Sequence, residues 1–290
     1  MPPAEGRACD APCAGRFAKL LDSVSMKNSR MKQTKPFRRR LVLTAAASLL
    51  LLPGLAAAQV WKQVEAAVKQ VGSAPVLEQG LQLNLPLVAE DGSSVPLTVI
   101  SDASGAGRIT RLAIFAPANP TPEVAVYEFG DAFDKLNLST RIRLSESQTV
   151  IAVAHTADGK AIVAERAVRV TVSGCIAPAK SDPAAEMKAR VRVPKKWDKN
   201  GGEVLTMISH PMITGLVADD TGNTPAQRIV QSFTAKLDGT PMLKARFFRS
   251  LAANPYLKFD MAPTQSGILT FEWVEDTGRK VEVTETVNLG

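Results

Sequence analysis

The chain has 290 residues, 45% of them hydrophobic and 22% charged, and a formal net charge of +7. Ten of its 35 Lys and Arg residues, but only three of its 28 Asp and Glu residues, lie in positions 1–58, which leaves 25 of each sign in the remainder. A protein that binds nucleic acid or an anionic membrane keeps its basic excess in the folded part, so the composition excludes both as expected partners.

The basic excess belongs to a segment with the form of an export signal. Three arginines at 38–40 lead into a short apolar core at 41–52, as in a twin-arginine signal. Small residues at 56–58 predict a cleavage site behind it. The core is shorter than the roughly 18 residues of a membrane span, and Pro53 follows it, so a retained membrane helix is the weaker interpretation.

We expect cleavage after residue 58 to give a mature chain that begins at Gln59, acts in the periplasm and has no membrane anchor. Residues before Met26 or Met31 add polar sequence that a signal does not need, and we expect them to lie upstream of the true start. Cys9 and Cys13 are then absent from the mature protein. With a single remaining cysteine it cannot form an intrachain disulfide, so packing must stabilise the fold.

The first predicted element is one amphipathic helix over residues 61–71, followed by the stop signals Gly72 and Pro75. Four large apolar side chains recur at helical spacing on one face: Trp61, Val64, Val68 and Val71. Trp61 can anchor this helix either to its own domain or to a second domain, and the sequence leaves both open.

From residue 81 the apolar period changes to two, which predicts β-strands. The expected strands are 81–87, 95–99, 112–115, 124–129, 138–144, 149–155, 161–165 and 168–172, with turns at 90–93 and 158–159. Short strands separated by frequent turns favour an antiparallel sandwich of immunoglobulin type over a parallel α/β sheet. The Cys-Trp-Cys core of antibody domains is missing.

Residues 173–186 are rich in Gly, Ala, Pro and Ser, which predicts an arm and linker between a domain at 59–172 and a second domain at 187–290. The second domain shows a further strand series: 189–193, 204–210, 229–237, 243–248, 257–261, 268–273 and 281–287. The predicted fold class is all-β, with two immunoglobulin-like antiparallel β-sandwich domains in tandem and one short N-terminal helix.

The single mature cysteine, Cys175, lies in the small-residue stretch after the strand-like run 168–172, beside Gly174 and near Pro178. Such backbone is usually exposed, whereas a structural cysteine is expected inside an apolar periodic segment. Reactivity is therefore a better reason for this thiol than packing. The alternative is an incidental linker residue.

The sequence gives no support for an enzyme, a cofactor or a metal. His155 and His210 are its two histidines, each beside a turn or a proline, where a structural role is ordinary. Zinc-protease, Cys-x-x-Cys, phosphate-loop and dinucleotide patterns are absent from the sequence. We interpret Asp219 and Asp220 as a turn, since the ligand series of a calcium loop is missing, and the sequon at Asn137 as a chance match.

The two halves resemble the subunits of the Sox sulfur-oxidation carrier, SoxY first and SoxZ second, joined in one polypeptide. The resemblance rests on co-linear segments in both halves: 85–92, 119–125, 139–144 and 148–154 in the first, and 209–215, 233–239 and 252–257 in the second. Long co-linear segments are more specific than any short motif in this chain.

The resemblance implies that the first half holds a sulfur substrate covalently on the cysteine of a glycine-rich arm and that the second half is a non-catalytic partner. Cys175 matches the arm cysteine, and Gly174 matches the glycine before it, here assigned as the arm hinge. The family arm ends at a free carboxyl terminus, whereas Ile176 and a whole domain follow here. From Val172 the thiol lies three residues away, roughly 10 Å of extended chain, so it must be presented on a loop.

The expected function is therefore a periplasmic sulfur-compound carrier that presents its cargo to partner enzymes. Its expected partners are periplasmic sulfur-oxidation enzymes and c-type cytochromes, or a quinoprotein dehydrogenase system, since fused carriers resemble proteins associated with such dehydrogenases. The two domains are expected to pack on each other. The alternative is a non-catalytic scaffold or recognition module attached to a quinoprotein dehydrogenase system.

Overall fold

The protein is described by a computed structural model that covers residues 59–101, 107–174, 186–198, 200–218 and 222–289. These residues belong to one compact unit, Leu55–Gly290. The described part is all-β apart from a short helical segment at its start, which confirms the predicted fold class.

The N-terminal segment is split where a single helix was predicted. A 3-10 turn, η1 (Val60–Gln63), precedes the α-helix α1 (Glu65–Val71), because Val64 between them has an extended backbone with φ −102° and ψ 102°. The break rotates the apolar stripe: Ala67 is buried, while Val68 is 41% exposed. The predicted face was therefore wrong at Val68.

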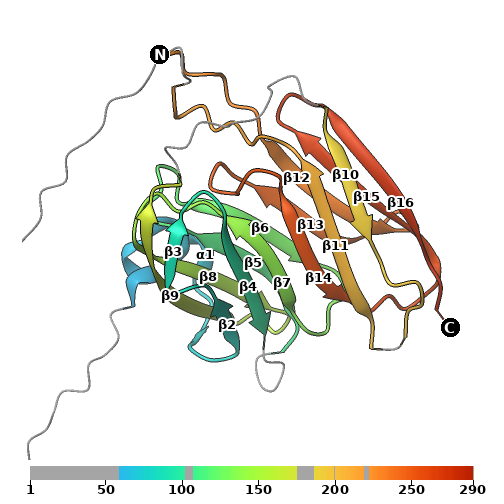
Figure 1. Ribbon diagram of the computed structural model, residues 1–290. Helices are drawn as coiled ribbons and strands as arrows, with labels where there is room; N and C mark the ends of the chain where they lie inside the picture. Colours follow the sequence, from blue (N-terminus) through green and yellow to red (C-terminus); the bar gives the residue numbers. More distant parts are fainter. Residues whose placement is uncertain (1–58, 102–106, 175–185, 199, 219–221, 290) are drawn as a thin grey trace, which may run out of the picture. The chain divides into compact units, whose positions relative to one another are not determined.

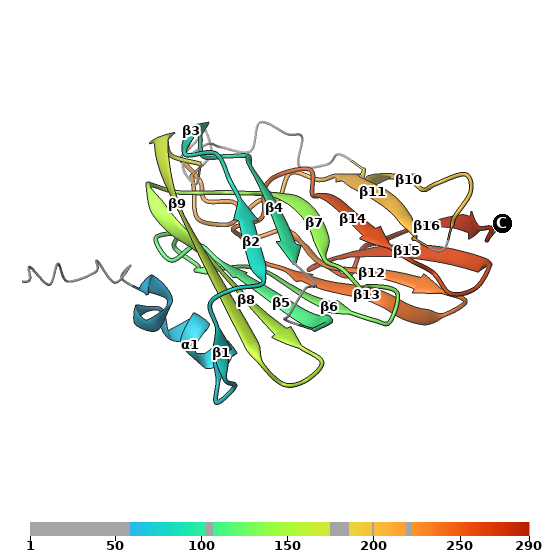
Figure 2. The same cartoon turned by 90° about the horizontal axis from the view of Figure 1, so that it is seen from below.

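Trp61 anchors this segment to the first half of the chain. It packs in a small apolar cluster with residues of two strands, namely Ala113, Phe115, Ile151 and Val153. Figure 2 shows α1 beside β1 and against the outer side of the same sheet. Of the two anchoring positions left open by the sequence, the structure shows the one within its own half.

Where the structure describes the first half, it forms nine strands: β1 (Val76–Leu77), β2 (Leu81–Asn84), β3 (Val88–Asp91), β4 (Val95–Ser101), β5 (Ile109–Phe115), β6 (Glu123–Phe129), β7 (Asn137–Ile142), β8 (Gln148–Thr156) and β9 (Ala161–Val172). The two strands predicted over 161–172 are one continuous strand. β1 and β3 were not predicted, and both pair in parallel with β9. The sandwich is thus not purely antiparallel.

The second half forms seven strands within its described residues: β10 (Lys188–Arg192), β11 (Gly202–Ser209), β12 (Val230–Leu237), β13 (Thr240–Phe247), β14 (Tyr256–Met261), β15 (Gly267–Glu275) and β16 (Lys280–Val287). Each coincides with a predicted strand to within a few residues. Alternation of apolar residues set these boundaries, as the burial pattern of β14 shows for Leu257, Phe259 and Met261.

The strands make two sheets, and both halves contribute to each of them (Figure 1). One sheet has the order β1-β9-β8-β5-β6-β13-β12-β15-β16, with β3 also paired to β9, and the other has the order β10-β11-β14-β7-β4-β2. The halves meet edge to edge in both sheets, through the antiparallel pairs β6–β13 and β7–β14.

The core is continuous across this double joint. One cluster of buried apolar residues draws on both halves. Within it, the rings of Phe133 and Phe259 lie 5.8 Å apart and those of Phe259 and Phe233 lie 6.5 Å apart, so aromatic contacts cross from one half to the other. Separation of the halves would expose two strand edges on each half, together with this apolar surface.

A chain cut in the linker is therefore expected to stay in one piece. Insertion of a protease site between residues 176 and 185, followed by cleavage, should leave the two fragments in a single peak on size-exclusion chromatography. The ladders of β6–β13 and β7–β14 and the shared core do not depend on the linker. Elution of the fragments as two separate species would show that the linker holds the halves together.

Candidate functional site

The end of β9, which leads to the predicted arm, pairs with two different strands along its length. The strand pairs with β8 as far as Val168, which lies opposite Gln148. Beyond that point β3 takes over as its parallel neighbour, with Val88 opposite Arg169 and Asp91 opposite Val172. The last residues of β9 therefore remain in a sheet up to the point where the arm begins.

Three backbone hydrogen bonds then fix the chain at Gly174. The amide of Gly92 donates to the carbonyl of Val172 at 2.8 Å, and the amide of Leu144 donates to the carbonyl of Gly92 at 2.8 Å. The amide of Gly174 donates to the carbonyl of Leu144 at 2.9 Å. We call these residues, Gly92, Leu144, Val172 and Gly174, the arm root.

The arm root depends on two glycines whose backbones touch. A Cβ atom on Gly174 would lie 1.9 Å from the carbonyl oxygen of Gly92, and a Cβ on Gly92 would lie 2.2 Å from the carbonyl oxygen of Leu144. Both distances are far below van der Waals contact, so these positions require glycine. Gly174 is buried and bonded at its amide, and its assignment as a hinge stays a prediction.

The surface around the arm root is partly apolar and partly acidic. Leu87, Val88 and Val172 are 69%, 52% and 60% exposed, which is unusual for large apolar side chains. Asp91 accepts hydrogen bonds from the backbone amide and the hydroxyl of Ser93 at 2.7 and 2.8 Å. These two bonds, the backbone one foremost, lower the pKa of Asp91, so its carboxylate stays ionised beside the root.

The predicted attachment residue, Cys175, lies outside the described residues, as does the rest of the chain up to residue 185. What the structure places is its neighbour Gly174, at the rim of the sandwich where β3 and β9 end.

Two protein families match this architecture in chain order. The family model described as sulfur oxidation protein SoxY matches residues 67–175, and the one described as sulphur oxidation protein SoxZ matches residues 191–286. The chain belongs to the SoxY and SoxZ families. It is a fused SoxY-SoxZ protein, and we refer below to its SoxY part and its SoxZ part.

A solved structure of the sulfur carrier protein SoxY from Chlorobium limicola f thiosulfatophilum is 32% identical to this chain, covering 39% of this chain and 99% of that protein, with a TM-score of 0.34. A β-glucuronidase of glycoside hydrolase family 2 matches at 12% identity over 73% of this chain and 20% of the other, with a TM-score of 0.23, and carries no functional argument. The comparison with curated proteins gave no match.

The SoxZ part reaches the arm root through Arg143, the residue before Leu144. Its guanidinium, almost fully buried, donates to the carbonyls of Pro211 and Met212 at 3.4 and 3.1 Å. Its backbone amide donates to the carbonyl of Ser250 at 2.8 Å. One peptide away, Leu144 holds Gly92 and Gly174, so the SoxZ part braces the segment on which the root is built.

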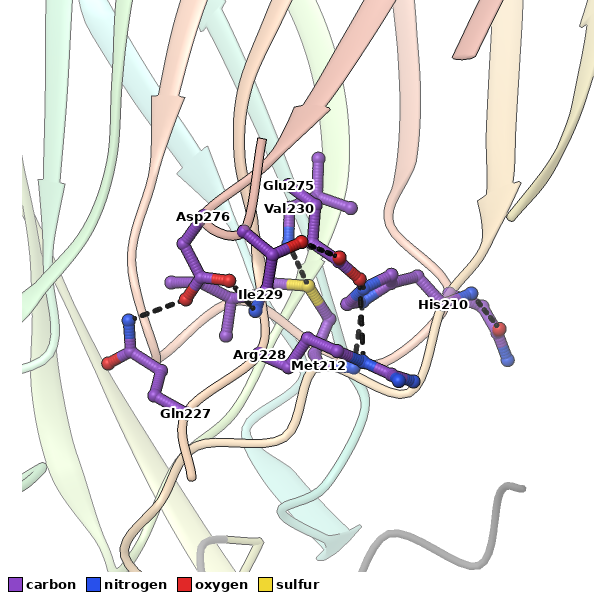
Figure 3. Close-up of polar contacts among 10 residues, drawn as sticks. His210, Met212, Gln227, Arg228, Ile229, Val230, Glu275 and Asp276 are labelled. Atoms are coloured by element: carbon purple, nitrogen blue, oxygen red, sulfur yellow. Dashed lines mark hydrogen bonds and ion pairs between the residues drawn. The ribbon is translucent and has the colours of Figure 1, made fainter. Parts of the chain in front are cut away.

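His210 of the SoxZ part lies in a buried polar cluster, shown in Figure 3. Its Nδ1 accepts the amide of Met212 at 3.0 Å, and its Nε2 lies 2.7 Å from the carboxylate of Glu275. Arg228 lies 3.4 Å from the same carboxylate oxygen, and the hydroxyl of Thr277 donates to the other. Because Nδ1 is an acceptor, the ring is neutral and donates through Nε2.

Burial sets the charge states in this cluster. It lowers the pKa of His210 by disfavouring the imidazolium, which outweighs the opposing pull of Glu275. Burial alone would raise the pKa of Glu275, but the hydrogen bonds from Thr277 and His210 and the charge of Arg228 outweigh it and lower the pKa. A neutral histidine bound to an ionised carboxylate is a structural arrangement here, as the sequence analysis expected.

The other residues considered from sequence have structural surroundings. His155 Nε2 lies 2.8 Å from the carbonyl of Gln70, at the end of α1. Asn137 donates to the carboxylate of Asp260 at 2.8 Å. Asp219 and Asp220 lie outside the described residues.

Within the described ranges, no group of three or more His, Cys, Asp or Glu side chains could hold a metal ion. None of the helices in that part of the chain is long and apolar enough to cross a membrane.

Sequence reasoning missed the partners of the arm root. Residues 90–93 were interpreted as a simple turn between strands, although Gly92 receives the backbone of Gly174 from the far end of the SoxY part. Leu144 and Arg143 were assigned only to a strand. A glycine after an acidic pair is a common turn signal. Its second role, which is to let the backbone of Gly174 approach closely, cannot be distinguished from a turn in one sequence.

Proposed function

We propose that the chain, which has a carrier role in sulfur oxidation as a member of both families, carries its sulfur cargo covalently on Cys175. The observation that supports this most directly is that the SoxY match ends at residue 175, the position of the single cysteine after residue 58. The fixed backbone of Gly174 supports it as well, since it gives the thiol a defined starting point.

A thiol suits a carrier because sulfur-sulfur bonds form and break by thiolate exchange under mild conditions. In the proposed loading reaction, the thiolate of Cys175 attacks a sulfenyl sulfur of the donor, and the donor's other fragment leaves with the electron pair. Transfer to an acceptor thiol reverses the roles. The carrier itself is neither oxidised nor reduced across the cycle, so it needs no catalytic centre of its own.

The proposal places the protein in the periplasm after removal of residues 1–58. The segment at 38–58 has the features of a twin-arginine signal, and Gln59 would be the first residue of the mature chain. Its partners would be periplasmic sulfur-oxidation enzymes and c-type cytochromes, or a quinoprotein dehydrogenase system. The exposed apolar residues Leu87, Val88 and Val172 beside the arm root give such partners a surface to recognise.

Tetrathionate provides a direct test. Attack of the Cys175 thiolate on one of its two inner sulfur atoms breaks the central S–S bond, releases thiosulfate and leaves a thiosulfonate, one sulfur plus one SO3 group, on the protein. We expect intact mass spectrometry of the mature protein to show this single adduct and to show its removal by dithiothreitol.

The control is Cys175→Ser, in which no adduct should form, because no other cysteine is present after residue 58. The same variant separates the carrier from a scaffold. A scaffold would support sulfur oxidation in cells with serine at this position, whereas a carrier would fail. Wild-type protein that gains no mass with tetrathionate or with a sulfide-derived donor would contradict the proposal.

A further inference from the structure

A pocket of about 520 Å³ opens at the joint between the SoxY and SoxZ parts. Thr121 and Glu123, at the start of β6, line it from the SoxY part. The SoxZ part supplies the rest: Gln227, Ile229, Gln231, Ser232, Arg246, Phe247, Phe248 and Arg249. Its volume is within the range of small-molecule sites, and it is separate from the arm root.

The pocket carries two arginines without a counter-ion. The guanidinium carbon of Arg246 lies 5.0 Å from the ring centre of Phe248, and Arg249 donates through Nε to the side-chain oxygen of Gln227. Across the described part of the chain, neither arginine forms an ion pair, and neither side chain has an interaction beyond these. Their remaining N–H donors are therefore available to a ligand.

Other polar side chains belong to the lining. Thr121 is among them, but its hydroxyl oxygen is buried with almost no accessible surface, so it offers no donor to a ligand. Gln231 and Ser232 add further polar side chains to the same lining.

The strands around the pocket exclude a bound peptide strand. β12 is paired on both sides, with β13 and β15, and β13 is paired with β12 and β6. Their backbone edges are occupied, so recognition must come from side chains. A metal cation is equally unsuited, because Glu123 is the single carboxylate in the described lining.

The charge of the pocket lining favours an anionic ligand. Two guanidinium groups and one carboxylate give the lining a net positive charge, and arginine is the side chain best suited to paired hydrogen bonds with an oxyanion. We propose that this pocket binds one tetrahedral oxyanion between Arg246 and Arg249. Sulfate, thiosulfate and phosphate share this chemistry. The site does not involve Cys175 and is independent of the proposed carrier reaction.

The test uses the mature chain with Cys175→Ser, so that covalent chemistry cannot contribute. Equilibrium dialysis with labelled sulfate at low ionic strength should show saturable binding of one anion per chain. Arg246→Gln and Arg249→Gln should each weaken binding about ten-fold or more, because each removes charge-assisted hydrogen bonds. Glu123→Gln should strengthen binding, since it removes the one negative charge in the lining.

The matched control is Lys244→Gln. Lys244 lies on β13 two residues before Arg246 and is exposed, but it does not line the pocket, so its loss should change affinity less than about two-fold. Arg246→Lys, which keeps the charge but loses the planar fork, should bind with intermediate affinity.

Competition by unlabelled thiosulfate and phosphate shows whether the site prefers sulfur oxyanions or accepts the whole class, and either result supports it. The proposal is overturned if the Cys175→Ser chain shows no saturable sulfate binding, if Lys244→Gln weakens binding as much as the arginine variants, or if Glu123→Gln does not strengthen it. Failure of tetrathionate loading on wild-type protein would leave this result unaffected.

Discussion

Replacing Gly174 by alanine is expected to lower the free energy of unfolding by about 3 kcal/mol, the upper part of the range for overpacking. The new Cβ would lie 1.9 Å from the carbonyl oxygen and 2.0 Å from the carbonyl carbon of Gly92. Both are backbone atoms, so no flexible side chain can move aside. Relief requires the two chain segments to separate, which breaks the hydrogen bond from the Gly174 amide to Leu144.

Urea denaturation of the two proteins measures this loss. Gly278→Ala is the matched control, because a Cβ there meets nothing within 4 Å and only the left-handed φ of 88° disfavours alanine, at a cost of about 1 kcal/mol. Gly92→Ala should resemble Gly174→Ala, since its Cβ would also strike backbone. Equal stability of Gly174→Ala and wild type would show that the arm root is not closed in solution.

Replacing His210 by alanine is expected to destabilise the protein by about 3–5 kcal/mol, the cost of removing one partner of a buried charged group. Glu275 has no exposed surface, and it would lose the Nε2 donor at 2.7 Å. Met212 would also lose the acceptor of its amide. For a chain of this size the midpoint of thermal unfolding should fall by on the order of 10 °C.

The second histidine is the natural control. His155 is half-buried and bonds to a backbone carbonyl instead of a carboxylate, so His155→Ala should cost only about 1 kcal/mol. Differential scanning calorimetry of both variants gives the comparison. Similar losses for the two variants would contradict the assignment of a buried ionised carboxylate to Glu275.

The same cluster fixes the direction of the pH dependence. The pKa values of both His210 and Glu275 are lower in the folded than in the unfolded protein, so the unfolded state binds more protons as the pH falls. The stability that these two groups contribute is fully present above about pH 6.5, the ordinary pKa of histidine, and is lost as the pH falls. In His210→Ala the part of the loss that begins near this pH should disappear. Denaturation curves collected from pH 7.5 downward test both statements.

The strands were the part of the fold that sequence could predict. In β4, Val95, Leu97 and Val99 alternate with less buried residues and are all buried, as a period of two requires. Turn residues marked the boundaries, and Gly159 and Gly278 both have the positive φ that such turns need. These strands and turns are determined by short-range residue patterns, which a single sequence contains.

Pairing could not be predicted in the same way. β3 is a four-residue strand whose parallel partner, the end of β9, lies far along the chain, and its exposed residues show no alternation. The edge-to-edge joints β6–β13 and β7–β14 equally have no local signal, because an edge strand and a central strand can share one apolar pattern. Long-range contacts determine both features.

The chemistry of the candidate site stays a prediction from sequence, and its structural support was missed. The single cysteine after residue 58, beside a glycine, stands out from composition and from the resemblance to SoxY. The residues that fix its neighbour, Gly92, Leu144 and Arg143, act through backbone contacts and through a bridge to the SoxZ part. None of these contacts depends on a distinctive residue pattern, so they became visible only in three dimensions.

The central claim is that Cys175 carries the cargo, and the most direct measurement locates the adduct within the chain. Trypsin cleaves after Arg169 and Lys180. This isolates residues 170–180, in which Cys175 is the single sulfur-containing residue. After loading with tetrathionate, the account predicts that this peptide alone gains the thiosulfonate group and returns to its original mass with dithiothreitol. An unmodified 170–180 peptide from protein that carries the adduct elsewhere, or that carries none, would contradict it.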